Sequence, residues 1–470
     1  MANSLTRDFT ATPTDAKKFT ISFWVRFTKF GSNQSIIANY GNSGNDDFAI
    51  QFRNDNTLGI IDWKGAGVNN NHESTRTFQD PTSWYHIVVA GDSTESTGSD
   101  RLKLYVNGLR ETSWASATDI GQNSDYNWNK ETDGTSLGHV IGQSGNGGNI
   151  FQGNLAHVHN VDGTALTPST FGETDSTTGE WKPKLNPSYT VGTNGWFLKF
   201  ENSGALGTDS SGNSATFTVS GNVKQSISTP SNLFATFNYF HNGVGQQNVI
   251  SKAGTQIDHA NDSYTGKITA ASLGMNKGKW YWETKYSTTG GYLSVGFGRN
   301  GCDDLTQNMR GSKQLGDDSD GNGNSWAFRA GNSSGQIVKK LRHNNQDAVA
   351  DMGVTPAVND IIQCWLDLDN GKAWWGINGT VMNSGSGVGV PNTGAYPHFT
   401  FTVGDEFYIP AVSLFGFNGA PQCQVNFGEG RFGTTAVSSG VADNGGNGTF
   451  EYSPLAGFYS ICTKNIKDYG

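Results

Sequence analysis

The chain has 470 residues, which at ~150 residues per domain predicts more than one domain, and we expect two. Only 34% of the residues are hydrophobic and 16% are charged, while 63 are Gly and 12% are aromatic, a composition that favours a loop-rich all-β protein and excludes a disordered chain. The 32 Lys and Arg against 41 Asp and Glu give a net charge of −9, which argues against binding to a nucleic-acid backbone.

Targeting and redox signals are weak. The first residues, MANSLTRDFT, contain no apolar stretch typical of a signal peptide, and no window approaches the ~20 apolar residues that span a bilayer. We therefore expect no membrane insertion and no export by a classical signal. The cysteines at 302, 364, 423 and 462 include no C-x-x-C pair and predict free thiols, with zinc or a disulfide framework as the alternative. Cys364 alternates with Ile362 and Leu366 and is expected to be buried.

The first half of the chain shows strand periodicity. Residues 19–27 (FTISFWVRF) place apolar side chains at every second position, and further strands are predicted over 84–90 and 101–106. The last of these ends in Asn107-Gly108, a dipeptide suited to a tight hairpin turn. Long polar loops join the strands, and no long stretch has helical periodicity, so we expect an antiparallel sandwich. The predicted inner face of the first strand consists of Phe19, Ile21, Phe23, Val25 and Phe27.

A polar, irregular stretch from about 201 to 233 marks a connection, after which a second β-rich block begins. Its predicted strands cover 280–286, 292–298, 412–417 and 423–427, and residues 361–380 predict strand, turn, strand and turn. Trp374 and Trp375 are adjacent in a strand, so one must face inward and the other outward or toward an interface.

The predicted fold class is therefore all-β, with two consecutive antiparallel β-sandwiches. The first covers residues 1–205, a linker covers 206–234, and the second covers 235–430. A Gly-rich stretch over 431–470 predicts an extended C-terminal tail.

Ordered motifs carry a family resemblance. The first block, with FTISFWVRF, SWYHIVVA, LKLYVNG and GNLAHVHNVDGTALTPSTFGETD, resembles a laminin-G/concanavalin-A-like domain. The second block, with GKWYWETKY, SVGFG, DIIQCWLDLDNGKAWWGING and VSLFGFNGAPQCQVNFG, is similar to SPRY domains. The succession of both, with YTVGTNGWFLKFENSGALGTDSSGN, STPSNLFATFN and the terminal CTKNIKDYG, resembles virion proteins of tailed bacteriophages.

This resemblance implies a non-enzymatic structural and recognition protein of a phage virion, either a tail fibre or a capsid fibre, that is assembled in the host cytoplasm. Its implied partners are other virion proteins and a host-surface carbohydrate or protein, which it would bind through its loops as a homo-oligomer, by analogy a trimer. Two alternatives stay open: a purely architectural capsid decoration or tail adaptor protein, and a glycan depolymerase with carboxylates assembled from separate loops.

No catalytic residue is predicted. Concanavalin-like glycoside hydrolases carry an E-x-D-x-x-E strand, because alternate residues face one cleft and supply nucleophile and acid. The nearest approach is Glu173-Thr174-Asp175, which lacks the second Glu and lies in a polar turn.

Calcium is the one cofactor that the sequence raises. Asp318, Asp320 and Asn322 match the first half of an EF-hand loop, but Arg329 stands where the bidentate Glu belongs. Asp46 and Asp47 precede the strand FAIQF, where a laminin-G-like calcium site could lie. Solvated acidic loops and ordinary turn residues are the alternative for both sets. His157 and His159 share a strand face, but no third zinc ligand is near in the sequence.

A candidate recognition surface comes from tryptophans in or beside polar loops. An exposed indole offers a flat apolar face for sugar C–H groups or a peptide, and nearby amides and carboxylates supply orienting hydrogen bonds. The alternative is that the loops bury these side chains as minor cores or form subunit contacts. The predicted ligand-binding residues are Trp63, Trp114, Trp128, Asp62, Asn69, Asp125 and Asn127.

Overall fold

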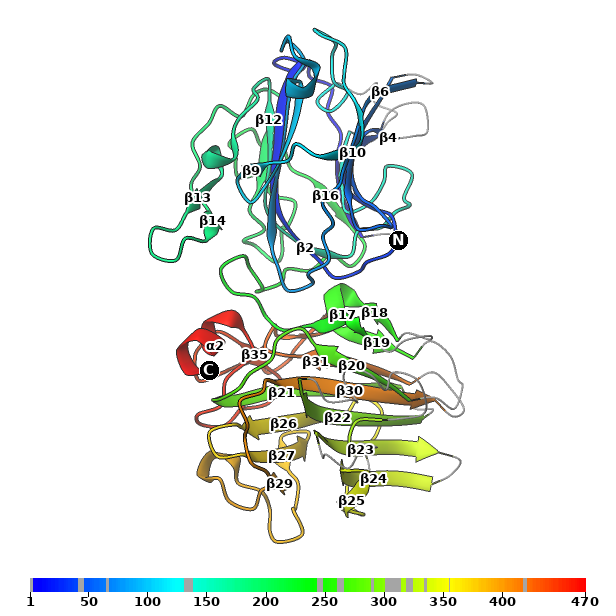
Figure 1. The fold of residues 1–470 in the computed structure, drawn as a ribbon, viewed down its shortest axis with the longest axis vertical. Helices are drawn as coiled ribbons and strands as arrows, with labels where there is room; N and C mark the ends of the chain where they lie inside the picture. The colour runs from blue at the N-terminus through cyan, green and yellow to red at the C-terminus, as the bar shows by residue number, and fades with distance from the viewer. Residues whose placement is uncertain are drawn as a thin grey trace. The chain divides into compact units, whose positions relative to one another are not determined.

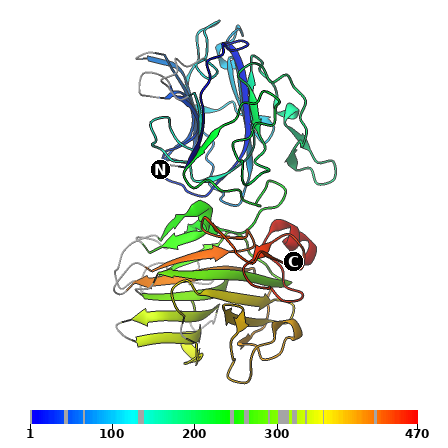
Figure 2. The same cartoon turned by 180° about the vertical axis from the view of Figure 1, so that it is seen from behind.

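The structure is a computed structural model that describes residues 3–40, 46–64, 67–130, 138–242, 248–259, 266–288, 291–300, 314–317, 324–333, 336–354, 356–416 and 421–470. The chain divides into two compact units, Met1–Ser231 and Asn232–Gly470 (Figures 1 and 2). Both units are built from paired antiparallel sheets, which confirms the predicted all-β class with two sandwiches. Within the described part of the chain, no helix has the length and apolar character that crossing a membrane requires.

The first unit contains an eight-stranded and a six-stranded antiparallel sheet. In spatial order the first sheet consists of β10 (Trp114–Thr118), β6 (Gly67–Ser74), β5 (Leu58–Lys64), β4 (Asp46–Phe52), β3 (Gln34–Tyr40), β11 (His139–Ile141), β1 (Ser4–Arg7) and β16 (Thr218–Ser220). The second consists of β15 (Trp196–Leu198), β12 (Gly153–Asp162), β2 (Lys18–Phe27), β7 (Tyr85–Asp92), β8 (Leu102–Val106) and β9 (Leu109–Arg110), and a separate hairpin consists of β13 (Gly172–Thr174) and β14 (Trp181–Pro183).

The predicted inner face of β2 lies in the core between the two sheets. Phe27 stacks on Phe52 of β4 with ring centroids 4.1 Å apart, and Phe19 meets Phe48 edge to face at 5.4 Å. Aromatic pairs of this kind bury large apolar areas and fix the two sheets against each other. The Asn107-Gly108 turn is also confirmed, since both residues have positive φ, 49° and 83°.

The other face of β2 is buried as well, because residues 164–190 cover it. Trp24 stacks on His86 of β7 at 4.9 Å, and the Thr20 hydroxyl donates to the Thr164 carbonyl oxygen at 2.8 Å. Phe171, at the end of a short 3₁₀ helix (Pro168–Thr170), forms a small second core with Val88. Strand alternation alone predicts one buried face, and the covering segment explains the second.

The second unit also pairs two antiparallel sheets. The seven-stranded sheet consists of β17 (Phe237–Asn242), β20 (Gly266–Ala271), β30 (Tyr408–Gly416), β22 (Gly291–Arg299), β23 (Ser325–Ser333), β24 (Gln336–His343) and β25 (Gln346–Val349). The eight-stranded sheet consists of β18 (Val249–Ser251), β19 (Gln256–Asp258), β31 (Gln422–Asn426), β21 (Lys279–Thr288), β26 (Ile361–Asp367), β27 (Lys372–Ile377) and β28 (Thr380–Val381), with β29 (Phe399–Thr400) paired to β27.

The core of the second unit is rich in tryptophan. Trp375 lies in the main core and donates its indole N–H to the Val295 carbonyl oxygen at 2.9 Å. Its neighbour Trp374 faces the other side of the sheet, under the C-terminal segment. The predicted division of this pair between two faces is therefore confirmed, and Cys364 is fully buried as expected. Cys423 and Cys462 are also buried free thiols.

The predicted extended tail over 431–470 is wrong, because this segment packs on the outer face of the eight-stranded sheet. Phe450 and Phe458 are fully buried in one cluster with Tyr281, Trp365 and Trp374. Large aromatics on a sheet face need a cover, and the segment supplies it. It contains β32 (Arg431–Phe432), β33 (Thr435–Ala436), β34 (Val441–Ala442), β35 (Thr449–Phe450) and α2 (Thr463–Tyr469).

Two buried carboxylates fix the C-terminal segment. Glu283 of β21 accepts hydrogen bonds from the backbone N–H groups of Glu451 and Tyr452 at 3.0 and 2.8 Å. Asp443 accepts from the Ser460 N–H and hydroxyl at 2.8 and 2.7 Å and from the Asn465 amide at 2.7 Å. Asn465 belongs to α2 and is fully buried. Polar residues therefore tie an aperiodic, Gly-rich segment into the fold.

The stretch predicted as a linker contributes to both units. Thr218 of β16 pairs with Thr6 of β1 at the edge of the first unit's sheet. Leu233 exchanges hydrogen bonds with Thr463 at the start of α2, through its N–H at 3.0 Å and its carbonyl oxygen at 2.9 Å. Each end of this stretch is thus held by the unit next to it.

Candidate ligand-binding site

Five of the seven predicted ligand-binding residues come together at the end of β5, and we call Asp62, Trp63, Asn69, Asp125 and Asn127 the Asp62 cluster. The buried Asp62 carboxylate accepts from the Asn127 side-chain amide at 2.6 Å and from the Asn69 side-chain amide at 3.2 Å. The Asn127 amide also donates to the Trp63 carbonyl oxygen, and the Asn69 amide lies 3.4 Å from the Asp125 carbonyl oxygen. Asp62 is thus saturated by donors and orients the two amides, so their oxygens are the groups left for a ligand.

Residues that the sequence did not single out position this cluster. The Asn39 side chain of β3 donates to the backbone carbonyl oxygens of Asn127 and Trp128, at 2.6 and 2.8 Å. Lys17 forms an ion pair with Asp125 at 3.4 Å. Both come from segments about 90 residues or more away in the sequence, so spacing gave no signal for them.

The Trp63 indole projects from the opposite face of β5. Trp63 is 37% exposed and lies directly across from Val68 of β6, which is 44% exposed. The two strands shift register between Asp62 and Trp63, which leaves Asn69 as the extra residue on β6. The end of this hairpin therefore presents an apolar pair on one face of the sheet and the oriented amides on the other.

The structure separates the other two tryptophans from the Asp62 cluster. Trp128 is fully buried, donates its indole N–H to Asn160 at 2.7 Å and packs against Phe48, so its predicted exposure is wrong. Its loop folds into the space between the sheets because the indole finds both apolar contacts and an acceptor there. Trp114 is half-buried against His72 and pairs with Ser74, at the opposite end of β6 from the cluster.

The predicted calcium ligands cannot be placed. Asp318, Asp320 and Asn322 lie outside the described residues, and so do the side chains of Asp46 and Asp47. Among the residues that are described, no three His, Cys, Asp or Glu side chains gather in a way that could hold a metal ion. His159 bonds instead to the Tyr189 hydroxyl through Nδ1 at 2.6 Å.

The carboxylate pair nearest to a hydrolase motif forms surface ion pairs. Glu173 and Asp175 flank the end of β13, and Lys182 of β14 lies 3.8 Å from Glu173 and 2.8 Å from Asp175. The hydrogen bond from Lys182 holds the pKa of Asp175 well below its ordinary value. A carboxylate kept ionised in this way cannot supply the proton that glycoside cleavage requires.

Glu283 has the raised pKa of a general acid but not the access. Burial raises its pKa from 4.5 to about 7, against the opposing effect of its hydrogen bonds. Its two oxygens accept from Tyr281, Asn426 and two backbone N–H groups, all beneath the C-terminal segment. A structural role accounts for this carboxyl group.

Comparison with known proteins supports the domain types that the motif order implied. Residues 6–170 match the family model of the concanavalin A-like lectin/glucanases superfamily, and residues 279–430 match that of the SPRY domain. The chain carries a concanavalin A-like domain followed by a SPRY domain. No curated protein sequence matches it.

Among solved structures, the chain is similar to the SPRY domain of human HERC1, with 16% identity over 36% of this chain and 87% of that chain and a TM-score of 0.25. It is similar to the TRIM65 PSpry domain, with 14% identity over 41% of this chain and 91% of that chain and a TM-score of 0.28. A putative carbohydrate binding protein from Bacteroides ovatus shares 17% identity over 47% of this chain and 56% of that chain, with a TM-score of 0.32.

Proposed function

We propose that the chain is a non-enzymatic recognition protein whose concanavalin A-like domain binds a surface carbohydrate at the Asp62 cluster. The observation that carries this proposal is the exposed Trp63 indole at the same strand end where a buried carboxylate orients two side-chain amides. The lectin-like fold of the domain supports it.

The chemistry of the cluster suits a sugar. Trp63 and Val68 offer apolar area for sugar C–H groups, while Asn69 and Asn127 offer amide oxygens that accept from sugar hydroxyls. Because Asp62 holds both amides by hydrogen bonds, little side-chain entropy is lost when a ligand binds. A single weak site of this size needs many copies for tight attachment.

The proposal includes the setting of a tailed-phage virion, as a tail fibre or capsid fibre that also contacts other virion proteins as a homo-oligomer. The resemblance of the connecting and terminal segments to virion proteins supports it. The terminal CTKNIKDYG motif also has a structural explanation, since it forms α2 and its Asn465 is buried. Calcium bound by Asp318, Asp320 and Asn322, or by Asp46 and Asp47, stays part of this proposal.

A glycan array with purified protein tests the binding. We expect the wild type to bind a defined set of glycans and Trp63→Ala to lose about tenfold in affinity, the effect of ~1.4 kcal/mol. Leu109→Ala is the matched control, because Leu109 is 71% exposed on β9 of the other sheet. Equal binding by Trp63→Ala and wild type contradicts the site, and no glycan binding at all favours a purely architectural role.

Two further measurements test the remaining parts of the proposal. Release of oligosaccharide from host polysaccharide by the purified protein would overturn the non-enzymatic assignment. Imaging of a virion by cryo-electron microscopy tests the setting, which fails if the particle contains no density for the two sandwiches.

A further inference from the structure

Asn-Gly pairs recur through the described part of the chain, and each has the residues that deamidation requires. The glycine has no side chain to hinder its own backbone nitrogen, which can therefore approach the side-chain carbonyl carbon of the preceding asparagine. The sequence makes all these pairs alike, whereas the structure holds their side chains differently. The pairs in which both residues are described begin at Asn107, Asn146, Asn194, Asn370, Asn378, Asn444 and Asn447.

In most of these pairs, the side-chain amide nitrogen donates to a fixed acceptor. Asn378 donates from Nδ2 to the Asp360 carboxylate at 2.7 Å, and its Oδ1 accepts from the Ile361 N–H at 2.9 Å. Asn444 donates to two backbone carbonyl oxygens, at 2.6 and 2.8 Å. The same nitrogen is also bonded in Asn194, Asn370 and Asn447. Because this nitrogen must leave as ammonia, and because its bonds keep the side chain in one orientation, these pairs are protected from deamidation.

Asn146, in the turn between β11 and β12, is held through its carbonyl oxygen instead. This Oδ1 accepts from the Ser144 hydroxyl at 2.6 Å and from the Gly148 N–H at 3.0 Å. A backbone N–H can only donate, so it fixes which side of the amide group is the oxygen. Within the described residues, the Asn146 Nδ2 takes part in no hydrogen bond. The carbonyl group is thus oriented while the leaving nitrogen is free.

Asn107 resembles Asn146 in its unbonded nitrogen but has one donor where Asn146 has two. In the part of the chain that is described, its Oδ1 accepts from the His86 N–H of β7 at 2.8 Å and from no other group. Its φ of 49° also fixes it in the hairpin turn between β8 and β9. Asn146 therefore differs from every other described Asn-Gly pair in the number of donors on its carbonyl oxygen.

Two donors on one carbonyl oxygen favour attack at its carbon. Attack by the Gly147 nitrogen on Asn146 Cγ places a negative charge on Oδ1, and preorganised donors stabilise this charge more than they stabilise the neutral amide. Ser144 is 3% exposed, so water competes little for its hydroxyl. The Gly147 N–H donates to the Ser144 carbonyl oxygen at 2.9 Å, and this bond must break before the attack. The turn has room for that change, because no atom of the described chain lies within 4 Å of the place that a Cβ on Gly147 would take.

We propose that Asn146 is a site at which the chain deamidates itself. The Gly147 nitrogen loses its proton to hydroxide and bonds to Asn146 Cγ, the Cγ–Nδ2 bond breaks, and Nδ2 takes a proton from water and leaves as ammonia. Water then opens the succinimide ring and yields aspartate or isoaspartate at this position. The reaction adds one negative charge to a chain with a net charge of −9. Isoaspartate also lengthens the backbone of a turn whose Asn149 carbonyl oxygen accepts from the Ser35 N–H of β3 at 2.7 Å.

Incubation of the purified full chain at mildly alkaline pH, followed by peptide mass spectrometry, tests the site. We expect Asn146 to convert to the acid about tenfold faster than Asn378, which is also exposed and is the matched control within the same chain. The rate at Asn146 should rise in proportion to the hydroxide concentration. In the chain unfolded by urea, the two should convert at similar rates, because the fold distinguishes them.

Ser144→Ala tests the donors directly. It removes one of the two groups that bond to Oδ1, so it should slow conversion at Asn146 about tenfold and leave Asn378 unchanged. Equal rates at Asn146 and Asn378 in the folded chain, or the same excess at Asn146 in the unfolded chain, overturn the proposal. A rate at Asn146 in Ser144→Ala that equals or exceeds the wild-type rate also overturns it. If the variant lowers the unfolding temperature, the comparison of folded and unfolded wild type decides alone.

Discussion

In each unit a chain segment packs on the outer face of one sheet, and we call this segment the cover of the unit. A buried histidine binds the cover of the first unit, and a buried carboxyl group binds the cover of the second. In the first unit, residues 164–190 lie over the six-stranded sheet and meet the neutral imidazole of His86. In the second unit, residues 431–470 lie over the eight-stranded sheet and meet the carboxyl group of Glu283. A sheet buried on both faces needs polar partners for its cover, and the choice of partner sets how each unit responds to pH.

The hydrogen bonds of His86 fix its protonation state. The Trp181 indole N–H donates to Nδ1 at 2.9 Å, and because an indole can only donate, Nδ1 carries no proton. The proton therefore lies on Nε2, which donates to the Ser22 hydroxyl at 2.8 Å. Burial lowers the pKa of His86 from 6.5 to about 3, because it desolvates the charged form. In the charged form Nδ1 would also carry a proton, and this N–H would face the indole N–H of Trp181. His139, between Trp196 and the Trp128 carbonyl oxygen, repeats this arrangement.

Glu283 has the opposite effect on stability. Its pKa rises from 4.5 to about 7 on folding, so the folded second unit favours the protonated form. Stability from this group is fully present below pH 4.5 and is lost as the pH rises toward 7. Stability from His86 is fully present above pH 6.5 and is lost as the pH falls toward 3. Acidification therefore weakens the first unit through His86 and strengthens the second through Glu283. In the second unit, burial lowers the pKa of His398 from 6.5 to about 4, and this group opposes Glu283 as the pH falls.

The largest expected effect is a divergence of two thermal transitions with pH. Between pH 6.5 and 3, His86 alone should cost the first unit about 5 kcal/mol, at ~1.4 kcal/mol for each unit of pKa change. Between pH 7 and 4.5, Glu283 should add about 3 kcal/mol to the second unit and His398 should remove a similar amount, so the stability of that unit should change little. Differential scanning calorimetry measures both transitions, and parallel movement of the two from pH 7 to 4.5 would contradict the comparison.

The second-largest effect is expected when a buried aromatic side chain is removed from the C-terminal segment. Phe450→Ala leaves a cavity against Tyr281, whose ring centroid lies 4.7 Å from that of Phe450, and should destabilise the second unit by about 3–5 kcal/mol. Phe407→Ala is the control, because Phe407 is 49% exposed and should cost less than ~1 kcal/mol. Urea unfolding measures both, and equal costs would show that the segment does not complete the fold.

Glu283→Gln should destabilise the second unit less than Phe450→Ala does, and it tests whether Glu283 contributes to the pH dependence of this unit. The hydroxyl oxygen of the protonated carboxyl group can still accept a hydrogen bond, whereas the amide nitrogen cannot. At least one donor therefore loses its partner, and the free energy of unfolding should fall by about 1–3 kcal/mol at pH 4.5. The variant should also lose the Glu283 contribution that falls between pH 4.5 and 7, so its second unit should gain stability over this range through His398. A second-unit transition with the same pH dependence as in the wild type would show that Glu283 does not contribute to it.

The smallest effect is expected at the first unit's cover. Trp181→Phe keeps an aromatic ring but removes the N–H that meets His86 Nδ1, which should cost about 1–2 kcal/mol at pH 7. Without the opposing donor, the pKa of His86 should rise. NMR titration of the imidazole measures this, and an unchanged pKa would show that burial alone keeps His86 neutral.

The sequence predicts those parts of the fold that depend on local pattern. Alternation in residues 19–27 gives the core face of β2, and the Asn-Gly dipeptides give turns with positive φ at Asn107 and again at Asn378. The covers were missed because their contacts join distant residues. Trp181 meets His86 across 95 positions and Tyr452 meets Glu283 across 169, so neither leaves a periodic signal.

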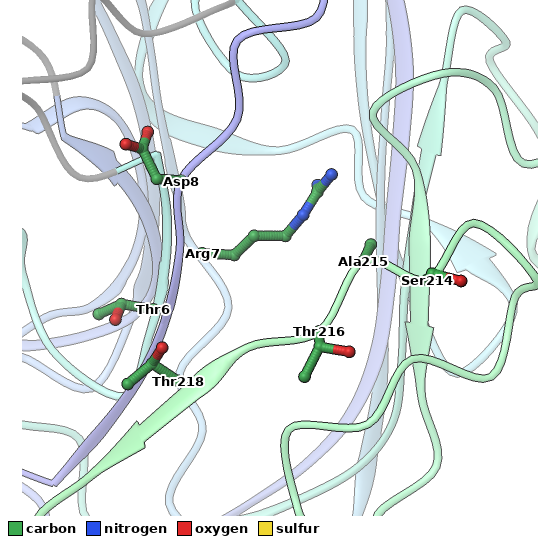
Figure 3. A pocket seen from close by; sticks show the side chains of 7 residues that line it. All are labelled: Thr6, Arg7, Asp8, Ser214, Ala215, Thr216 and Thr218. Carbon is green, nitrogen blue, oxygen red and sulfur yellow. The ribbon is translucent and has the colours of Figure 1, made fainter.

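The sequence predicts those members of the candidate site whose position follows from the chemistry of the side chain itself. Asp62, Asn69 and Asn127 are short polar side chains beside strand ends, and they gather because the carboxylate attracts the amide donors. Trp128 was misplaced because loop polarity does not report burial, which for this side chain depends on Asn160 from another strand. The pocket between residues 6–8 and residues 214–218 (Figure 3) had no signal in the sequence, because its two walls are more than 200 residues apart.

Each unit is closed by contact between its own beginning and its own end. Ser4 of β1 pairs with Ser220 of β16, and Leu233 bonds to Thr463, 230 positions later. On the ribosome, neither closing contact can form until nearly the whole unit has been synthesised. We expect the strands of each nascent sandwich to stay incompletely paired until the final strand or helix of the unit emerges from the exit tunnel. Their exposed edges are sites to which chaperones can bind.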